Sequence, residues 1–198
     1  MSRIAARGVA AGVAATLAAG AVGILRQRAE GAAIRRGELQ PAPAAADVAP
    51  RRPPGRVGDR LAHWVPQPPR HPATRTAAFA WAAPLTAVGW ALAGAAGRRP
   101  RWHDGYRCWV VDGVRGPSAA ALRLVGAEAN AVGHVVLSRR VAPSEVLLAH
   151  EAVHVRQAER LGPLLLPAYV WLAARYGYRD HPLERAARLG ARTATATT

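Results

Sequence analysis

The sequence predicts an α+β fold, in which a small antiparallel β-meander is followed by a helix with a His-Glu-x-x-His motif and two further helices. Short runs of aromatic and β-branched residues between positions 106 and 137 indicate the strands. An uninterrupted helical pattern from position 143 to 162 contains the motif. An uncharged run at 76–97 predicts a candidate transmembrane helix before this domain, and a disordered N-terminal region precedes that run.

Composition allows one domain with appendages in a chain of 198 residues. The formal net charge is +15, from 27 basic and 12 acidic residues, and every basic residue is an arginine. Arginine without lysine, in a chain rich in Ala, Gly and Pro, is typical of GC-rich coding sequence. No basic motif is interleaved with aromatic residues, so we expect no nucleic-acid partner. Cys108 is the only cysteine, which excludes an intrachain disulfide and a zinc–thiolate cluster.

Residues 1–75 form an N-terminal region rich in Ala, Arg and Pro. Within it, residues 8–25 carry no charge and are flanked by arginines, which indicates a weak signal or membrane segment. A loose Ala-rich helix fits the same residues equally well. Residues 26–75 contain too few large apolar side chains to bury a core, so we interpret them as a disordered linker.

The run at 76–97 is a stronger candidate for a membrane span, because it includes Phe79, Trp81 and Trp90 and has no charged residue. At about 1.5 Å per residue, a helix of this length matches a bilayer core of about 30 Å. Pro84 is expected to kink it. A buried helix of a soluble domain is the alternative. Residues 98–198 then form the domain that contains the motif.

Three segments of that domain favour strands. Residues 106–111 run into Asp112-Gly113, a hairpin-type turn signal. Residues 121–125 are a weaker candidate, and residues 133–137 are a better one. We read these as consecutive antiparallel strands. Residues 133–137 are also expected to offer an edge to which an extended peptide can pair, which requires that this strand has a neighbour on one side only.

The motif helix is expected to begin near Pro143-Ser144-Glu145 and to end at Gly162-Pro163. In this frame His150 and His154 lie one turn apart on the inward face, where both imidazoles can bind one metal ion. Glu151 lies beside them and is the candidate general base that takes a proton from water. A second helix is predicted at 163–174 and a short last helix at 182–189, ending at Gly190.

A catalytic zinc ion usually has three protein ligands, so one more donor is needed. We favour Glu184 on the last helix as the third metal ligand, because it lies thirty positions after His154, and a connection of that length allows the last helix to pack beside the first. His181 remains an alternative ligand, in which case Glu184 caps the helix. Asp180 is a third candidate. His134, on a predicted strand, is interpreted as a hydrogen-bonded structural residue rather than a ligand.

These segments resemble a group of small bacterial gluzincin-like zinc metallopeptidases, many of them with membrane segments. The resemblance rests on His150-Glu151-Ala152-Val153-His154 and on the later His181-Pro182-Leu183-Glu184-Arg185-Ala186-Ala187. The family pattern there is Asn-Pro-Phe-Glu-Arg-Glu-Ala, so this chain differs at His181, Leu183 and Ala186. The family's third ligand matches Glu184. The resemblance covers about the last hundred residues and none of the first 75.

The resemblance implies a zincin-type domain that binds Zn²⁺ and hydrolyses a peptide or protein substrate at a bacterial cell membrane. Glu151 would then activate water, with His150, His154 and Glu184 as metal ligands. The competing hypothesis is a non-catalytic metal-binding domain that serves as a membrane-tethered sensor or scaffold. In a third hypothesis the two histidines are ordinary structural residues of a helix.

Overall fold

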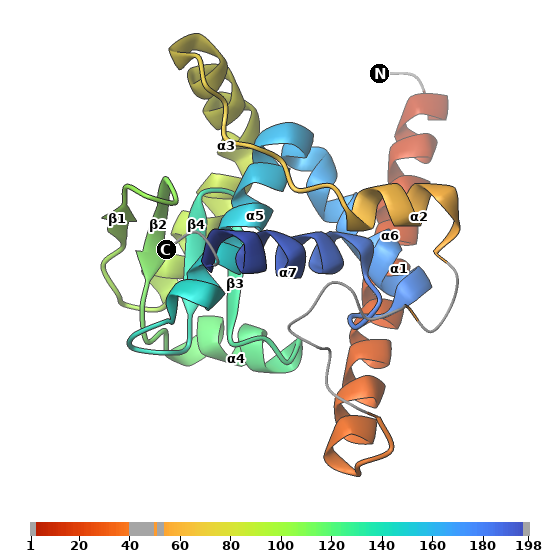
Figure 1. Cartoon of the computed structure of the whole chain (residues 1–198). Coiled ribbons are helices and arrows are strands. Elements are labelled where there is room, and N and C mark those ends of the chain that lie inside the picture. The colour runs from red at the N-terminus through yellow and green to blue at the C-terminus, as the bar shows by residue number, and fades with distance from the viewer. Residues whose placement is uncertain (1–2, 40–49, 51–53, 196–198) are drawn as a thin grey trace.

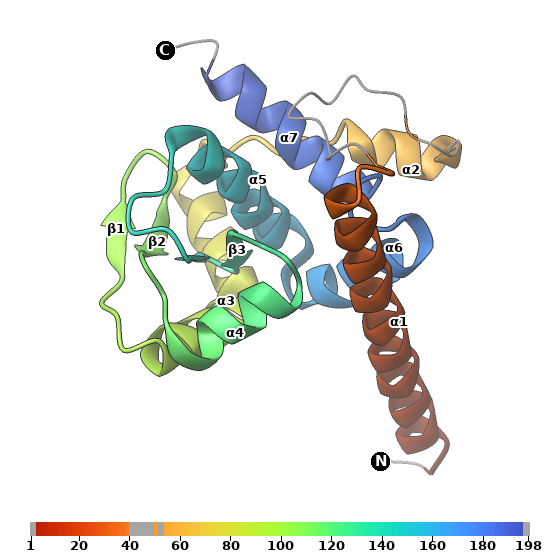
Figure 2. The ribbon, with the colours of Figure 1, turned by 90° about the horizontal axis from the view of Figure 1, so that it is seen from below.

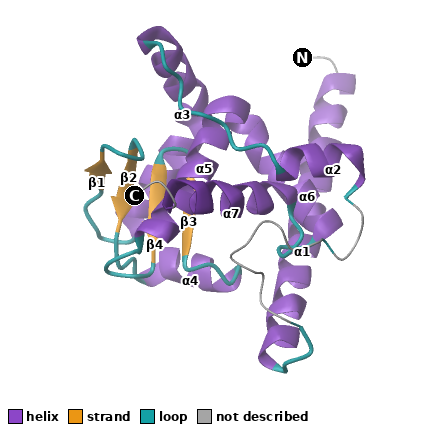
Figure 3. Cartoon of the chain, viewed as in Figure 1, coloured by secondary structure: helices purple, strands orange, loops and turns teal. Residues whose placement is uncertain are grey.

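A computed structural model describes residues 3–39, 50 and 54–195 of the chain. These residues form helices, one short 3-10 turn and one four-stranded sheet, so the fold belongs to the α+β class (Figures 1 and 3). The elements follow in the order α1 Arg3–Arg35, α2 Gly55–Ala62, α3 Pro72–Ala95, β1 Arg101–His103, β2 Cys108–Val111, α4 Gly116–Leu124, β3 Ala129–Val132, β4 Val135–Ser138, α5 Glu145–Leu161, η1 Gly162–Leu164, α6 Leu165–Tyr176 and α7 Pro182–Thr195.

The sheet is mixed, with the strand order β1-β2-β4-β3. β1 pairs with β2 and β3 pairs with β4 in antiparallel fashion, whereas β2 and β4 are parallel. The prediction of an antiparallel meander is therefore wrong, because the two central strands are parallel. Parallel neighbours need a crossover connection, and α4 provides it. Residues 121–125, predicted as a strand, fall largely within this helix, and Asp112-Gly113 leads into the crossover instead of closing a hairpin.

Helix α3 packs against the sheet, α5 and η1 (Figure 2). It begins four residues before the predicted run, where the His71 side chain accepts a hydrogen bond from the N–H of Ala73. A Cβ atom at Gly89 would lie 2.6 Å from the carbonyl oxygen of Val132 and 2.7 Å from Cβ of Val135. No larger residue fits between this helix and the sheet. The middle of α3 therefore belongs to the same core as the strands.

Of the helices in the described residues, α3 alone has the length and hydropathy of a membrane span. Its most apolar window is 28% buried inside the protein. A helix in the core of a soluble domain can have the same length and hydropathy, so these two properties do not by themselves identify a membrane span. Large apolar side chains nevertheless remain exposed on α3, namely Trp81, Val88 and Trp90.

A buried polar network ties α3 to the β3–β4 turn and to α5. The backbone N–H of His134 donates to the hydroxyl of Thr86 over 3.1 Å, and that hydroxyl donates to the carbonyl of Ala82. Nε2 of His134 lies 3.2 Å from a carboxylate oxygen of Glu159. His134 is 1% exposed and its polar atoms have partners, so its interpretation as a structural residue is confirmed.

Helix α5 has the bounds that its end signals predict, with Ser144 accepting a hydrogen bond from the N–H of Leu147. Helix α7 lies across α5 (Figure 1). It continues through Gly190 to Thr195, so the predicted end at Gly190 is wrong. A Cβ atom at Gly190 would lie 2.5 Å from Cγ2 of Val153. The glycine allows α7 to approach α5 closely and does not end the helix.

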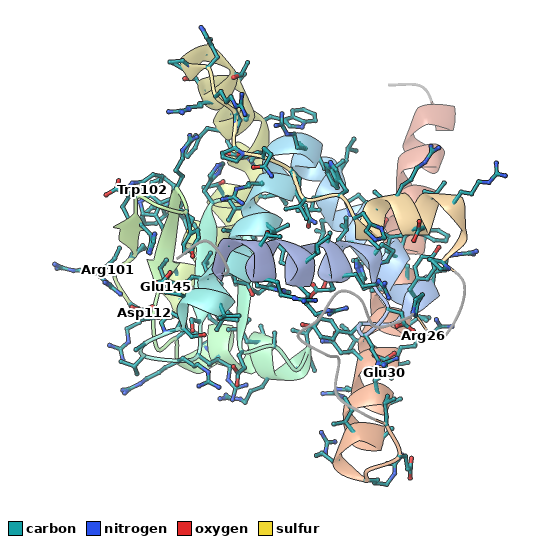
Figure 4. The ribbon with its side chains drawn as sticks, in the orientation of Figure 1. Arg26, Glu30, Arg101, Trp102, Asp112 and Glu145 are labelled. Atoms are coloured by element: carbon teal, nitrogen blue, oxygen red, sulfur yellow. The ribbon has the colours of Figure 1, made fainter. Side chains whose placement is uncertain are left out.

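Helix α1 contains the run at 8–25 and continues to Arg35, so residues 26–35 of the predicted linker are helical, as are residues 55–62 in α2. Residues 40–49 and 51–53 of that linker lie outside the described part of the chain. Helix α1 packs against α6, and Arg26 donates to the carbonyl of Arg175 over 2.8 Å. Glu30 accepts from the N–H groups of Tyr178 and Arg179 (Figure 4).

Candidate metal centre

Three side chains from two helices converge on one point between α5 and α7. The ligand atoms of His150, His154 and Glu184 all lie within 4.8 Å of one another. Nε2 of His150 is 3.2 Å from Oε2 of Glu184, and Nε2 of His154 is 3.2 Å from Oε1 of the same carboxylate. The three residues were predicted as metal ligands. The packing of α7 against α5 brings Glu184 to the two histidines.

Two of the three separations between these atoms fit a tetrahedral cation of the size of zinc, and the third, between the two imidazoles, is within 4.8 Å. Bonds of about 2.0–2.1 Å at a tetrahedral angle place two ligand atoms about 3.3 Å apart. Both measured separations between imidazole and carboxylate are close to that value. Oε2 of Glu184 is buried and has no hydrogen-bond partner with acceptable geometry, although Nε2 of His150 is near it. An oxygen left unsatisfied in this way is available to a metal ion.

Gln157 fixes the orientation of the His154 ring. Its Nε2 atom donates to the carbonyl of Leu183 on α7, which leaves Oε1 to accept from Nδ1 of His154 over 2.9 Å. Because Nδ1 is the donor to Gln157, Nε2 faces Glu184 and the candidate metal position, and it presents a lone pair there once its proton is displaced. Hydrogen bonds of this kind from the outer nitrogen are the usual support of a metal-binding histidine.

The metal-free centre is a buried ion pair. Burial alone would lower the pKa of His154, but the Glu184 carboxylate outweighs burial and raises that pKa to about 9. Burial would raise the pKa of Glu184, and the imidazoles of His154 and His150 instead hold it well below its ordinary value. A cation that binds here must therefore displace a proton from His154.

Glu151 lies next to these three residues but outside the donor group. It is 3% exposed, and its Oε2 atom has no hydrogen-bond partner among the described residues. Burial raises the pKa of its carboxyl group, while His150, His154 and a backbone hydrogen bond from Ala131 act in the opposite direction. Burial thus stabilises the protonated form of this carboxyl group, and a carboxyl group in this position is a candidate for taking up and returning a proton.

Two tyrosines border the centre, and sequence reasoning could not place either of them. The hydroxyl of Tyr169 donates to Oε1 of Glu184 over 2.6 Å. The charge of Glu184, together with burial, raises the pKa of Tyr178 well above its ordinary value, so its phenol stays protonated. No sequence signal identifies them, because neither has a fixed spacing from the motif.

His181, the alternative ligand, faces elsewhere. Its Nε2–H group donates to the carbonyl of Tyr169 over 3.0 Å, and its ring packs on the Tyr169 ring with centroids 4.2 Å apart. Burial lowers the pKa of His181 to about 4. Asp180 lies 3.7 Å from Arg179. Among these three candidates, Glu184 is the one that lies with the two histidines.

Two cavities meet at His150 and Glu151. One, of about 240 Å³, is mainly apolar and is enclosed by α1, α6 and the loop before β3. The other, of about 740 Å³, lies between β3, the N-terminal end of α5 and the arginine-bearing face of α7. The candidate centre is therefore open to a molecule that extends in both directions from it.

The strand that was predicted to offer an edge is not at the edge of the sheet. Residues 133–137 contain β4, which pairs with β2 on one side and β3 on the other, so the prediction that they form an edge is wrong. The sheet ends instead at β3, whose residues Ala129 and Asn130 line the smaller cavity. The low β-propensity of Ala-Asn-Ala-Val concealed this strand in the sequence.

No family model matches the chain, and neither a curated protein nor a solved structure matches it.

Proposed function

We propose that this protein is a zinc-dependent metallopeptidase with a minimal zincin-type domain, in which His150, His154 and Glu184 hold the metal ion. The observation that carries the proposal is the convergence of these three donors within 4.8 Å of one another, with both imidazole–carboxylate separations at 3.2 Å. The buried carboxylate of Glu151 beside them supplies the acid–base group that hydrolysis needs. The resemblance of the two motifs to small gluzincin-like peptidases agrees with this assignment.

When bound, zinc supplies Lewis acidity, which polarises a carbonyl group and makes water a stronger acid. Glu151 takes the proton from the attacking water and returns it to the amine that leaves. Its burial favours the uptake of this proton, because burial raises the pKa of the carboxyl group. Tyr169 holds the Glu184 carboxylate in place, and Gln157 holds His154.

The substrate in this proposal is a peptide in extended conformation. The edge strand β3 runs past Glu151, and no strand of the described sheet pairs with it on the side away from β4. A peptide that pairs with β3 enters both cavities with its side chains and presents a carbonyl group to the centre. The backbone N–H of Ala131 is already used by Glu151, which fixes that carboxylate relative to the strand.

Association with a membrane is the second part of the proposal. Trp81, Val88 and Trp90 are exposed on α3, whose other side packs on the sheet. Exposed tryptophans on an apolar helix are suited to the interface of a bilayer. We place the protein at the bacterial cell membrane through this face of α3.

The test combines zinc content with turnover. Purified full-length protein is expected to bind about one zinc ion per chain and to cleave members of a peptide library, detected by mass spectrometry. Glu151→Gln is expected to keep the zinc ion and to lower the cleavage rate at least about a hundredfold. Glu145→Gln, an exposed carboxylate on the same helix, is the matched control and is expected to retain activity.

Other results of the same experiment discriminate between the hypotheses. Zinc binding with no cleavage of any peptide would favour a non-catalytic sensor or scaffold. Loss of zinc from Glu151→Gln would assign Glu151 the wrong role. Absence of zinc from the unmodified protein, with no change in melting temperature on adding zinc or a chelator, would refute the metal centre itself.

A further inference from the structure

The larger cavity beside the candidate centre has arginines on one wall. Arg188 and Arg192 lie one turn apart on α7, and both line the cavity that also contains His150 and Glu151. Arg188 is one turn beyond Glu184, and its guanidinium group lies beside Arg179 in the loop between α6 and α7. Two cations of fixed spacing on a rigid helix form a suitable frame for an anion.

Arg188 is half-buried and is not part of any salt bridge within the described residues. Its Nη2 atom donates to the carbonyl of Arg179 over 2.6 Å, which fixes one side of the guanidinium group. Burial lowers its pKa, and the charge of Glu184 acts in the opposite direction. A half-buried cation held by a carbonyl group gains free energy when a carboxylate reaches it.

The opposite wall of this cavity contains two carboxyl groups, those of Glu128 and Glu151, and burial favours the neutral form of Glu151 by raising its pKa. Ser144, Val146 and Leu147 belong to the N-terminal end of α5, where the helix dipole is positive. Glu128 also lines the cavity, but Arg140 binds both of its carboxylate oxygens, at 2.8 Å and 2.7 Å. The dipole of α5 and the arginines of α7 therefore favour the same kind of ligand, an anion.

The smaller cavity has a different character. Apolar side chains line it where it leaves the centre, among them Leu166, Val170 and Ala173 of α6 and Ile24 of α1. A peptide lying across the centre would thus meet an apolar environment on one side of the reacting bond and a basic one on the other. The smaller cavity therefore favours apolar side chains of a peptide, and the larger cavity favours acidic groups.

We propose that Arg188, with Arg192, binds a carboxylate of the peptide substrate on the α7 side of the bond that is cleaved. This inference rests on the proposed peptidase function and narrows the substrate class to peptides with a negative charge at that end. The carboxylate has two possible sources, the free C-terminus of a short peptide or the side chain of an Asp or Glu residue. Arg188 is a specificity-determining residue in this assignment and takes no part in proton transfer.

The test uses three hydroxamic acids, which anchor to zinc and extend into the cavity. They share one peptide backbone and differ in their charge. The first ends in a free carboxylate, the second ends in an amide, and the third ends in an amide but has a Glu side chain. Their dissociation constants are measured by calorimetry on the zinc-loaded protein. The same peptides without the hydroxamate group are titrated into the metal-free protein, so that binding of the carboxylate is measured separately from binding of zinc.

Unmodified protein is expected to bind one of the two carboxylates about ten- to a hundredfold more tightly than the neutral amide. Preference for the first compound identifies the C-terminal carboxylate, and preference for the third identifies an acidic side chain. Arg188→Met is expected to remove the preference, and Arg192→Met to reduce it. Arg99→Met, which removes an exposed arginine away from the cavity, is the control for the overall positive charge and is expected to leave the preference intact.

Equal binding of all three compounds by the unmodified protein would overturn the inference, whatever the zinc content. A preference that survives in Arg188→Met, or that is lost equally in Arg99→Met, would also overturn it. If the protein binds no zinc, the proposed function fails. The titrations of the metal-free protein then show independently whether the cavity prefers a carboxylate. A preference seen there and lost in Arg188→Met supports the inference.

Discussion

The side chain of Gln157 joins His154 to the helix that carries Glu184. It accepts a hydrogen bond from Nδ1 of His154 over 2.9 Å and donates to the carbonyl of Leu183, the residue before Glu184. One buried amide therefore sets the position of both metal-binding elements relative to each other. The orientation of the amide is unambiguous, because a carbonyl group can only accept.

Removal of this amide is expected to weaken zinc binding. Gln157→Leu leaves Nδ1 of His154 and the carbonyl of Leu183 without a partner, and the ring is then free to rotate. We expect zinc affinity to fall about ten- to a hundredfold, the usual effect of losing such a support. Competition with a chromogenic chelator measures it. Gln67→Leu, at an exposed position, is the control, and equal affinity in the two variants would contradict the role given to Gln157.

His181 is expected to make stability depend on pH. Its folded-state pKa of about 4 lies below the ordinary value of 6.5, so the unfolded chain binds more protons between these two pH values. The contribution of neutral His181 is complete above pH 6.5 and is lost as the pH falls towards 4. The loss amounts to about 2–3 kcal/mol at pH 4.5.

His181→Asn isolates this effect, because an asparagine amide can still donate to the carbonyl of Tyr169. The variant should lose less stability than the unmodified protein between pH 6.5 and 4.5, as measured by urea unfolding of both in the metal-free state. His63→Asn, at an exposed histidine, serves as the control. Parallel pH profiles for His181→Asn and the unmodified protein would rule out a buried neutral histidine at this position.

Local signals sufficed to predict some elements. The Ser144 cap and Gly162-Pro163 fix the ends of α5 from neighbouring residues alone, and that helix places His150 beside His154. A short apolar run gives no such signal. Residues 121–125 fit a strand or a buried helix equally well by pattern, and the neighbouring packing of α4 decides between them.

Features that depend on distant residues were less accessible. The parallel pairing of β2 with β4 has no local signature, because it follows from the crossover through α4. Glu184 was predicted from its distance along the chain from His154 and from the resemblance of its motif. Tyr169 and Tyr178 have no such spacing and belong to no such motif. Their place beside the centre is set by how α6 and the following loop pack on α5 and α7.

Gly190 provides a test of the close approach between α7 and α5. Alanine in a helix interior is ordinarily favoured over glycine by about 1 kcal/mol. Here the added methyl group would lie 2.5 Å from Cγ2 of Val153, a buried and rigid side chain next to His154. We expect Gly190→Ala to destabilise the protein by about 1–3 kcal/mol, as overpacking does.

The double-mutant cycle with Val153→Ala identifies the cause. Removing the methyl groups of Val153 makes room for the alanine, so the cost of Gly190→Ala should shrink in that background. Thermal or urea unfolding of the four proteins measures the coupling. A stabilising effect of Gly190→Ala alone would mean that α7 continues through this residue without the close approach to Val153.

The contact between Thr86 and His134 decides whether α3 belongs to the domain that contains the metal centre. A separate membrane span would leave the domain at 98–198 stable without it, whereas the structure places Thr86 in the same buried network as His134 and Glu159. Thr86→Val keeps the shape of the side chain and leaves the backbone N–H of His134 without an acceptor. We expect it to destabilise the protein by about 1–3 kcal/mol. Thr76→Val, at an exposed position on the same helix, should have an effect within about 0.5 kcal/mol. Unfolding of both variants in detergent gives the comparison.

If Thr86→Val and Thr76→Val were equally stable, and a chain starting at Arg98 folded and bound zinc, α3 would be an independent membrane anchor. The structure predicts instead that a chain starting at Arg98 does not fold, because Val132, His134 and Val135 lose the surface against which they pack.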